Sequence, residues 1–134
     1  MPESGPVTAL IVDDDIDIRA LVRVVLEASE LGIHVVAEAV DGEEAVAVFE
    51  RLVPPPVPAI VILDNRMPYL SGIEAAEEMR RIVPLQHIVL FTAYLTPALA
   101  ARAKKAGIDA CLSKSDVEEL PALVISPTRP GSPA

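Results

Sequence analysis

The sequence predicts a single α/β domain in which helices cover both faces of a doubly wound parallel β-sheet. Apolar runs of strand length alternate along the chain with segments of helical period, which is typical of consecutive β-α-β units. The runs are residues 9–12, 33–37, 59–63, 88–91 and 110–112. With 134 residues, the chain has room for one hydrophobic core of ordinary size.

The composition is that of a folded domain with few aromatic residues. Hydrophobic residues make up 51% and charged residues 23% of the chain, close to globular averages. Aromatic residues contribute only 3%, so aliphatic side chains must build the core. The formal net charge is -9, which opposes the neutralisation of phosphates on which most nucleic-acid binding depends. We therefore expect no direct binding of nucleic acid by this chain.

Three observations bear on the cellular compartment. Cys111 is the only cysteine, which excludes an intramolecular disulfide. The first residues lack the basic and apolar regions of a signal peptide. No apolar run approaches the length of a membrane span. We expect a cytoplasmic domain that does not contact a membrane.

The first two helices are predicted on either side of the second strand. In the first, apolar residues recur at i, i+3, i+4 and i+7, which places them on one helical stripe. The members of this stripe are Ile18, Leu21, Val22 and Val25. Asp41 and Glu44 have the spacing of a capping box and begin the second helix, which Pro54 should end. Its predicted buried face consists of Ala45, Val48, Phe49 and Leu52.

Capping residues also predict the third and fourth helices. Ser71 and Glu74 repeat the capping-box spacing, and this third helix must end before Pro84 because proline disfavours helical geometry in the preceding residue. Thr96 followed by Pro97 is the pattern of an N-cap and a first helical residue. A fourth helix is therefore predicted to begin at this pair.

The end of the chain is predicted to hold a short last helix and a tail. Gly107 should close the fourth helix, and a fifth should follow Lys114. Pro121 falls inside the apolar spacing of the fifth helix, where an interior proline costs about 3 kcal/mol, so that helix should be short, kinked or begun late. The folded domain then covers residues 7–120, which the fifth helix can extend to 125. Residues 126–134 form a Pro/Ser-rich tail.

Polar residues follow four of the five predicted strands. Because the carboxyl ends of parallel strands lie on one edge of the sheet, these residues should converge there. They are Asp13, Asp14 and Asp15 after the first strand, Asp64 after the third, Thr92 after the fourth and Lys114 after the last. Clustered carboxylates need a cation, and oxygen ligands of this kind suit Mg²⁺. A lysine and a threonine nearby can hold phosphoryl oxygens, so the sequence predicts a phosphoryl-handling site.

Four stretches resemble the receiver domains of bacterial two-component response regulators. They are LIVDD at 10–14, LDNRMP at 63–68, LFTA at 90–93 and CLSK at 111–114. The resemblance extends from residue 7 to about 120 and implies a flavodoxin-like sheet with strand order 2-1-3-4-5. Within the family, AVDGEEAV and AGIDACLSKS are most similar to receivers that precede LuxR-type DNA-binding domains.

The resemblance implies a role for each clustered residue. Asp64 would be the phosphoacceptor, and Mg²⁺ would be bound by Asp64, by Asp14 directly and by Asp13 through water. The backbone carbonyl of Arg66 would complete the metal site. The residues expected to hold the phosphoryl oxygens are Thr92 and Lys114.

The resemblance also implies partners and a limited chemistry. A sensor histidine kinase or a phosphotransfer protein would supply the phosphoryl group. A downstream protein, or a fused output domain if the natural chain is longer, would receive the signal. No enzymatic activity is expected beyond Mg²⁺-dependent self-phosphorylation and self-dephosphorylation.

Two positions near Lys114 depart from the family pattern, in the region where receiver domains change conformation on phosphorylation. Cys111 stands where the family usually has an aromatic residue, and Ser115 stands where a proline is common. Arg66 and Tyr94, each two residues beyond a site residue, should flank the path of attacking water and set the phosphate lifetime. With a cysteine in the aromatic position, Tyr94 is expected to respond to phosphorylation instead of Cys111.

Other interpretations of the same residues remain open. Taken singly, the acidic run at 13–15 could cap a helix, and Lys114 could be an ordinary solvated lysine. A haloacid-dehalogenase-like phosphatase would use Asp13 as its nucleophile. A phosphorylation-independent interaction module would keep only the shape of the domain. The joint occurrence of polar residues at four strand ends favours the receiver interpretation.

Overall fold

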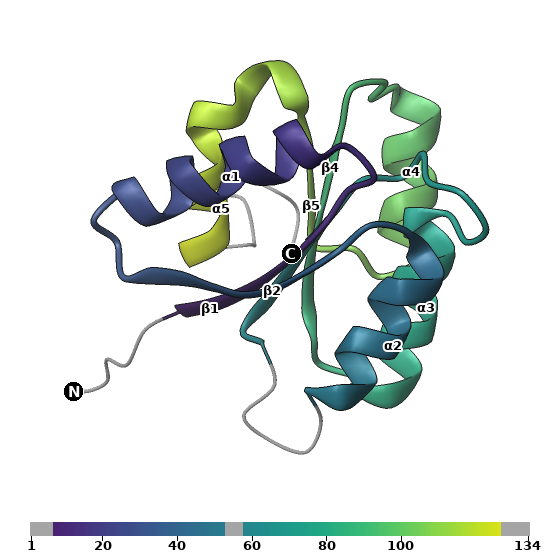
Figure 1. Cartoon of the computed structure of the whole chain (residues 1–134). Helices are drawn as coiled ribbons and strands as arrows, with labels where there is room; N and C mark the ends of the chain where they lie inside the picture. Colours follow the sequence, from purple (N-terminus) through teal and green to yellow (C-terminus); the bar gives the residue numbers. More distant parts are fainter. Residues whose placement is uncertain (1–6, 53–57, 127–134) are drawn as a thin grey trace.

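The computed structural model describes residues 7–52 and 58–126, which form a five-stranded parallel sheet in the order β2-β1-β3-β4-β5 (Figure 1). The strands are β1 (Val7–Val12), β2 (Ile33–Ala39), β3 (Ile60–Leu63), β4 (His87–Thr92) and β5 (Ala110–Ser113). Every neighbouring pair is parallel. The predicted fold class and strand order are confirmed, and the strand ends differ from the predicted runs by one or two residues.

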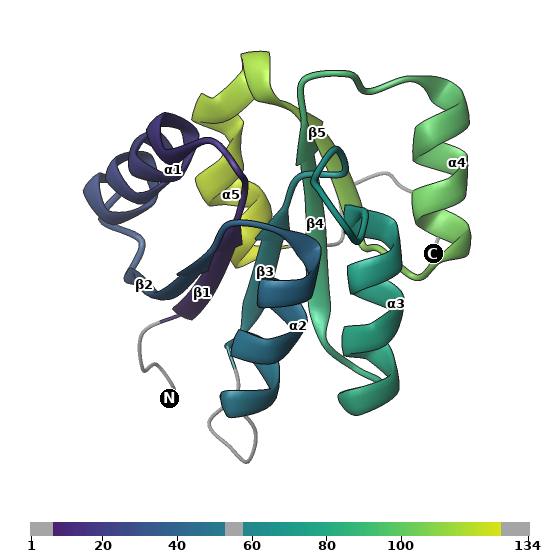
Figure 2. The same ribbon diagram turned by 45° about the vertical axis from the view of Figure 1, so that its right-hand side comes forward.

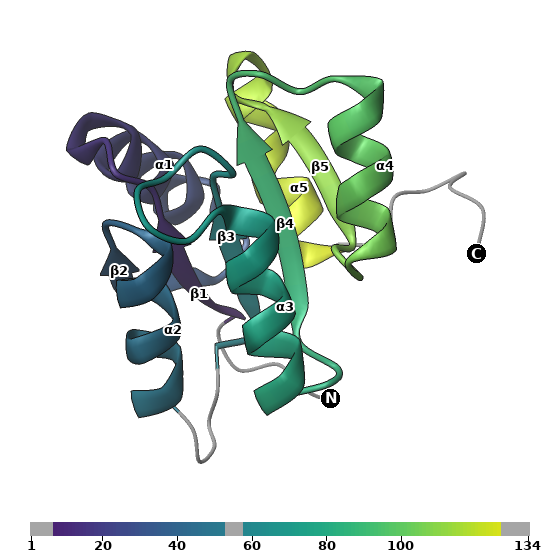
Figure 3. The ribbon, with the colours of Figure 1, turned by 90° about the vertical axis from the view of Figure 1, so that its right-hand side faces the viewer.

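Helices cover both faces of this sheet (Figure 2). They are α1 (Ile16–Ala28), α2 (Gly42–Arg51), α3 (Gly72–Ile82), α4 (Pro97–Lys105) and α5 (Leu120–Ile125), with a 3₁₀ helix at Lys114–Glu119. Figure 3 shows α2, α3 and α4 together on one face, while α1 and α5 lie on the other. In the described part of the chain, no helix has the length and apolarity to cross a membrane.

The sheet separates two apolar clusters. Alternate residues of β1 contribute to them: Leu10 and Val12 pack toward α2, α3 and α4, whereas Ala9 and Ile11 pack toward α1 and α5. All four residues of β3 are buried, as expected of a central strand covered on both sides. The continuous apolar runs in the sequence reflect this double coverage.

The predicted caps of α2 and α3 are present. The Asp41 side chain accepts from the Glu44 N–H at 2.7 Å, while the Glu44 carboxylate accepts from the Val40 N–H one residue before the cap. In α3, Ser71 and Glu74 form a complete capping box. That helix ends at Ile82, before Pro84 as predicted.

The start of α4, its end and the start of α5 each lie at a residue that favours a helix boundary. Thr96 caps α4 through the Leu99 N–H at 3.1 Å. Gly107 follows α4 with φ at +90°, a left-handed backbone conformation that favours glycine. Pro121 lies in the first turn of the short helix α5, where its missing N–H leaves no helical hydrogen bond unmade. Pro54 lies outside the described residues, as does the predicted tail except for its first residue, Ser126.

The predicted buried stripe of α1 is confirmed at Val22 and wrong at Leu21, while Ile18 and Val25 are half-buried. Its buried residues are Arg19, Val22 and Leu26, whereas Leu21, predicted to be buried, is 43% exposed. The apolar residues of α1 lie on several sides of the helix, and Val24 is exposed like Leu21. The spacing of apolar residues alone therefore does not fix which side of α1 faces the core. Arg19 lies on the buried side of α1, where it donates to the Asp13 carbonyl and to Glu38.

Candidate functional site

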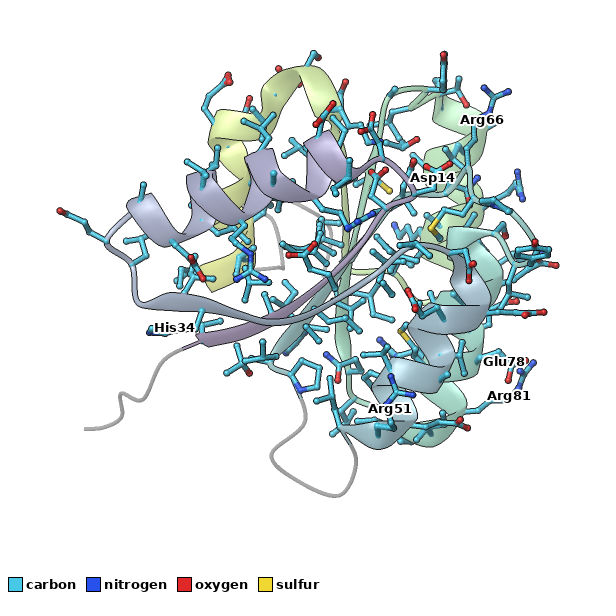
Figure 4. The ribbon with its side chains drawn as sticks, in the orientation of Figure 1. Asp14, His34, Arg51, Arg66, Glu78 and Arg81 are labelled. Atoms are coloured by element: carbon cyan, nitrogen blue, oxygen red, sulfur yellow. The ribbon has the colours of Figure 1, made fainter. Side chains whose placement is uncertain are left out.

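Carboxylates from two strand ends meet at the carboxyl edge of the sheet. Asp13 and Asp14 follow β1 and Asp64 follows β3, and oxygens of the three carboxylates lie within 4.8 Å of one another. Figure 4 shows Asp14 and Arg66 at this same edge. The convergence predicted from the parallel sheet is therefore present.

Lys114 joins the two sides of this acidic cluster from the end of β5. Its Nζ lies 2.7 Å from Asp13 Oδ2 and 3.1 Å from Asp64 Oδ2. Burial lowers the pKa of Lys114, but hydrogen bonds and attraction from Asp13 and Asp64 outweigh it and raise that pKa above its usual value. The ammonium therefore stays charged between the two carboxylates.

Asp13 is the most enclosed of the three acids, with 2% of its surface exposed. Its Oδ1 accepts from the Asp15 N–H at 2.9 Å, and its Oδ2 faces Lys114. Burial raises the pKa of Asp13, against the lowering effect of both contacts. Both oxygens of Asp13 therefore have partners within the protein.

The chemistry of the cluster fits Mg²⁺. Its ligand atoms are carboxylate oxygens, which Mg²⁺ prefers, and Asp14 is exposed, which suits an ion that keeps several of its waters. Three carboxylates with one ammonium leave two negative charges uncompensated, and a divalent cation balances them. The sequence prediction of a Mg²⁺-type cluster thus agrees with these ligand types.

The loop that carries Asp64 is tied to the sheet and to α3. The Asp64 N–H donates to the Val12 carbonyl at 3.1 Å, and Asp64 Oδ1 accepts from the Asn65 N–H at 2.8 Å. The Asn65 side chain accepts from the Ile73 N–H, and its carbonyl accepts from the Gly72 N–H. These bonds hold the Asp64 carboxylate in place.

Gly72 is required for this close approach, so Gly72→Ala should destabilise the fold strongly. A Cβ at Gly72 would lie 2.2 Å from the Asp64 carbonyl oxygen and 2.9 Å from Asn65 Cα. Because the clash is with backbone, we expect a loss of about 3 kcal/mol or more in the free energy of unfolding. Gly32→Ala is the control: Gly32 has φ at +75° but open space, and should lose about 1 to 2 kcal/mol. Urea unfolding followed by circular dichroism measures both; equal losses would contradict the prediction.

Arg66 and Tyr94 contact each other beyond the ends of β3 and β4. The Arg66 guanidinium carbon lies 4.5 Å from the centroid of the Tyr94 ring, the geometry of a cation–π interaction. Arg66 comes from the loop after β3 and Tyr94 from the loop after β4. The sequence predicted both residues beside the site, but not their contact with each other.

Thr92 and Cys111 lie on the neighbouring strands β4 and β5. Thr92 ends β4, is 1% exposed and accepts from the Tyr94 N–H at 3.4 Å. Cys111, on β5, is half-buried and packs against the apolar cluster under α2, α3 and α4. Its part in a phosphorylation switch stays a prediction.

Sequence reasoning missed a charged group next to the acidic cluster. Arg19 is buried, and its Nη1 donates to the Asp13 carbonyl at 2.6 Å. Arg19 and Arg23 both donate to the Glu38 carboxylate on β2. Burial raises the pKa of Glu38, but Arg23 and Arg19 together outweigh it and lower that pKa. The available signal was the spacing of Arg19 with Val22 and Leu26, which places a charge inside an apolar stripe.

Comparisons with known proteins agree on one family. The family model described as the response regulator receiver domain matches residues 9–125. The transcriptional regulatory protein PdtaR of Mycobacterium tuberculosis H37Rv is 38% identical over 128 residues, which cover 92% of this chain and 58% of PdtaR. The chemotaxis protein CheY of Thermotoga maritima is 35% identical over 98 residues, which cover 73% of this chain and 77% of CheY.

A solved structure gives the same result at the level of the fold. The crystal structure of a LuxR-family two-component response regulator from Aurantimonas sp. SI85-9A1 superposes with a TM-score of 0.82 at 31% identity. The match covers 96% of this chain and 91% of that chain. The chain spans only 58% of the length of PdtaR.

Proposed function

Because the chain belongs to the family of response regulator receiver domains, we propose that Asp64 is its phosphoacceptor and that Mg²⁺ binds beside it. Receiver domains accept phosphoryl groups in two-component signal transduction. The observation that carries the assignment is the position of Lys114 Nζ, which contacts the carboxylates of both Asp13 and Asp64. One cation thereby joins the candidate acceptor to the candidate metal ligands.

The proposed metal ligands come from two loops. Asp14 and Asp64 would supply carboxylate oxygens directly, Asp13 would act through water, and Arg66 would supply its backbone carbonyl. When bound, Mg²⁺ supplies positive charge that offsets the charge on the phosphoryl oxygens.

The chain's own residues position the reaction. A carboxylate oxygen of Asp64 attacks the phosphorus of a phosphohistidine or a small acyl phosphate. A new P–O bond forms, and the bond to the donor breaks with its electron pair leaving on the donor atom. Lys114 lies 3.1 Å from the attacking carboxylate, so its charge is in place before the phosphoryl group arrives. The Thr92 hydroxyl would donate a hydrogen bond to a phosphoryl oxygen.

The same proposal includes the partners and the output. A cytoplasmic sensor histidine kinase or phosphotransfer protein would supply the phosphoryl group. The added charge would draw Thr92 and Lys114 inward, shift the loops after β4 and β5, and change the surface of α4, β5 and α5. A downstream protein or fused output domain would bind that surface.

Labelling with acetyl phosphate tests the acceptor and the metal together. The protein is incubated with acetyl phosphate in Mg²⁺ or in EDTA, and the modified residue is mapped by mass spectrometry. We expect one phosphoryl group, on Asp64, in Mg²⁺ only. Labelling on Asp13 would instead support the phosphatase alternative. Absence of labelling, also with a phosphorylated histidine kinase domain as donor, would support the phosphorylation-independent module.

The Arg66–Tyr94 pair should lengthen the lifetime of the acyl phosphate. Both side chains would flank the path of the attacking water, so Arg66→Ala and Tyr94→Ala should admit water and speed dephosphorylation severalfold. Because the two side chains act as a stacked pair, the double variant should decay no faster than the faster single variant. Decay of labelled protein after removal of acetyl phosphate measures this.

A second tyrosine supplies the control for the lifetime measurement. Tyr69, 81% exposed on the loop after β3, should give wild-type decay as Tyr69→Ala. Unchanged decay in both Arg66→Ala and Tyr94→Ala would contradict the shielding role. Tyr94 would then be an exposed aromatic side chain available to a partner.

A further inference from the structure

We infer that Arg19 is a positioning residue for the metal site, because it holds the peptide that joins Asp13 to Asp14. This inference rests on the proposed function, in which these two acids bind Mg²⁺. Arg19 touches neither the acceptor nor the Arg66–Tyr94 pair in any contact described above. Its proposed effect passes entirely through the backbone of the acidic pair.

The contact between Arg19 and the acidic pair is buried and short. Arg19 lies on the first turns of α1 with 9% of its surface exposed, and its Nη1 donates to the Asp13 carbonyl oxygen at 2.6 Å. A hydrogen bond from a charged donor is stronger than one between neutral groups. Loss of the donor would leave a buried carbonyl without this partner, which costs more than an exposed bond.

The geometry of the peptide transmits this contact to both carboxylates. The Asp13 carbonyl and the Asp14 N–H belong to one planar peptide unit, so a bond that fixes the carbonyl also fixes the direction in which Asp14 leaves the backbone. Asp13 has further supports, because its N–H donates to the Ala39 carbonyl at 3.1 Å and its carboxylate accepts from the Asp15 N–H. The exposed Asp14 side chain depends more on the orientation of the peptide.

Glu38 in turn fixes the guanidinium group. Arg19 Nε donates to Glu38 Oε1 at 2.9 Å, and Arg23 donates to Glu38 Oε2 through Nε at 3.0 Å and Nη2 at 2.7 Å. Glu38 belongs to β2, the strand that pairs with β1. Through Glu38, β2 therefore orients Arg19, and Arg19 in turn orients the peptide after β1. Groups that orient metal ligands in this way typically change metal affinity by about 10- to 100-fold when they are removed.

A purely electrostatic role for Arg19 makes the opposite prediction. A guanidinium charge beside the site repels a divalent cation, so its removal would strengthen Mg²⁺ binding. A positioning role predicts weaker binding after removal, because the ligands lose their fixed orientation. The sign of the change therefore separates the two roles.

The test compares Arg19→Met with Arg23→Met, using calorimetric titration of the whole chain with Mg²⁺ and no phosphoryl donor. Both substitutions remove a charge of α1 and a partner of Glu38, but Arg19 also bonds Asp13. We expect the Kd for Mg²⁺ to rise about 10-fold or more in Arg19→Met. In Arg23→Met, whose side chain is 40% exposed, it should stay within about twofold of wild type.

Two more measurements separate positioning from general damage to the fold. Labelling by acetyl phosphate should be slow in Arg19→Met at low Mg²⁺ and return to the wild-type rate at saturating Mg²⁺, because only the affinity is impaired. Arg19→Lys, which keeps the charge and one point donor, should give an intermediate Kd. If Arg19→Met does not fold, the Kd for Mg²⁺ is compared between Arg23→Met and the two milder variants Arg19→Lys and Glu38→Gln.

The outcomes distinguish this inference from the proposed function. If Arg19→Met binds Mg²⁺ as tightly as wild type or more tightly, the positioning role is overturned. An equal weakening in Arg23→Met, or a labelling rate that Mg²⁺ does not restore, overturns it as well. Wild-type protein that neither binds Mg²⁺ nor is labelled on Asp64 would overturn the proposed function itself.

Discussion

Asp64→Asn is expected to take up no phosphoryl group while keeping its fold. An amide oxygen does not attack phosphorus in this way. It can still accept one of the two hydrogen bonds that the carboxylate accepts through its two oxygens, from the Asn65 N–H or from Lys114. The substitution also removes one of three mutually repelling charges, which offsets the lost hydrogen bond. The free energy of unfolding in EDTA should therefore stay close to that of wild type.

Mass spectrometry after incubation with acetyl phosphate and Mg²⁺ measures the phosphorylation of Asp64→Asn, and urea unfolding in EDTA measures its stability. Asp15→Asn is the matched control, because Asp15 caps α1 next to the cluster and asparagine caps equally well. It should be labelled as wild type is. Full labelling of Asp64→Asn would show that another residue accepts the phosphoryl group.

Lys114→Met should destabilise the protein strongly when no divalent cation is present. The substitution leaves the carboxylates of Asp13 and Asp64, 2% and 6% exposed, without the ammonium that lies between them. Removal of one partner of a buried ion pair typically costs about 3 to 5 kcal/mol. Mg²⁺ should restore part of this loss, about 2.7 kcal/mol at one hundred times its Kd. Labelling of Asp64 should remain slow, because the phosphoryl oxygens lose a cation.

The loss in Lys114→Met should also depend on pH. Burial already raises the pKa of Asp13, and the substitution removes the contacts with Lys114 that lower it. The folded variant then binds a proton at Asp13 more tightly than the unfolded chain does. Its stability relative to wild type should therefore improve as the pH falls from neutral into the range in which Asp13 takes up that proton.

Urea unfolding in EDTA at several pH values, repeated in Mg²⁺, checks both parts of this prediction. Lys105→Met is the control, since Lys105 is an exposed residue at the end of α4. It should unfold as wild type does at every pH. A loss in Lys114→Met that neither acid nor Mg²⁺ reduces would show that its packing, and not its charge, supports the fold.

The sequence was sufficient to predict which residues share the edge of the sheet. Asp13, Asp64 and Lys114 are far apart along the chain, but each directly follows a strand. The rule that parallel strands present their carboxyl ends on one edge is general, and it needs only the strand positions. The caps at Ser71 and Thr96 were equally accessible, because capping depends on a few neighbouring residues.

Contacts that depend on rotation or on loop shape were not accessible in this way. The Arg19–Glu38 pair joins a helix to a strand 19 residues away, and apolar residues on every side of α1 concealed which side is buried. The stacking of Arg66 on Tyr94 depends on two loops whose conformations no periodic pattern describes. Both contacts depend on how the elements pack in the folded protein, which the local sequence does not specify.

The position of Lys114 has a consequence for the synthesis of the chain. Lys114 follows Asp64 by 50 residues, so the ribosome releases the three acids of the edge well before their shared ammonium. Until β5 docks beside β4, these carboxylates repel one another without that compensation. The attraction of Lys114 to Asp13 and Asp64 therefore favours the docking of the last strand. A nascent chain that ends before Lys114 already carries the candidate acceptor, but it gains the ammonium between Asp13 and Asp64 only when the whole sheet has been translated.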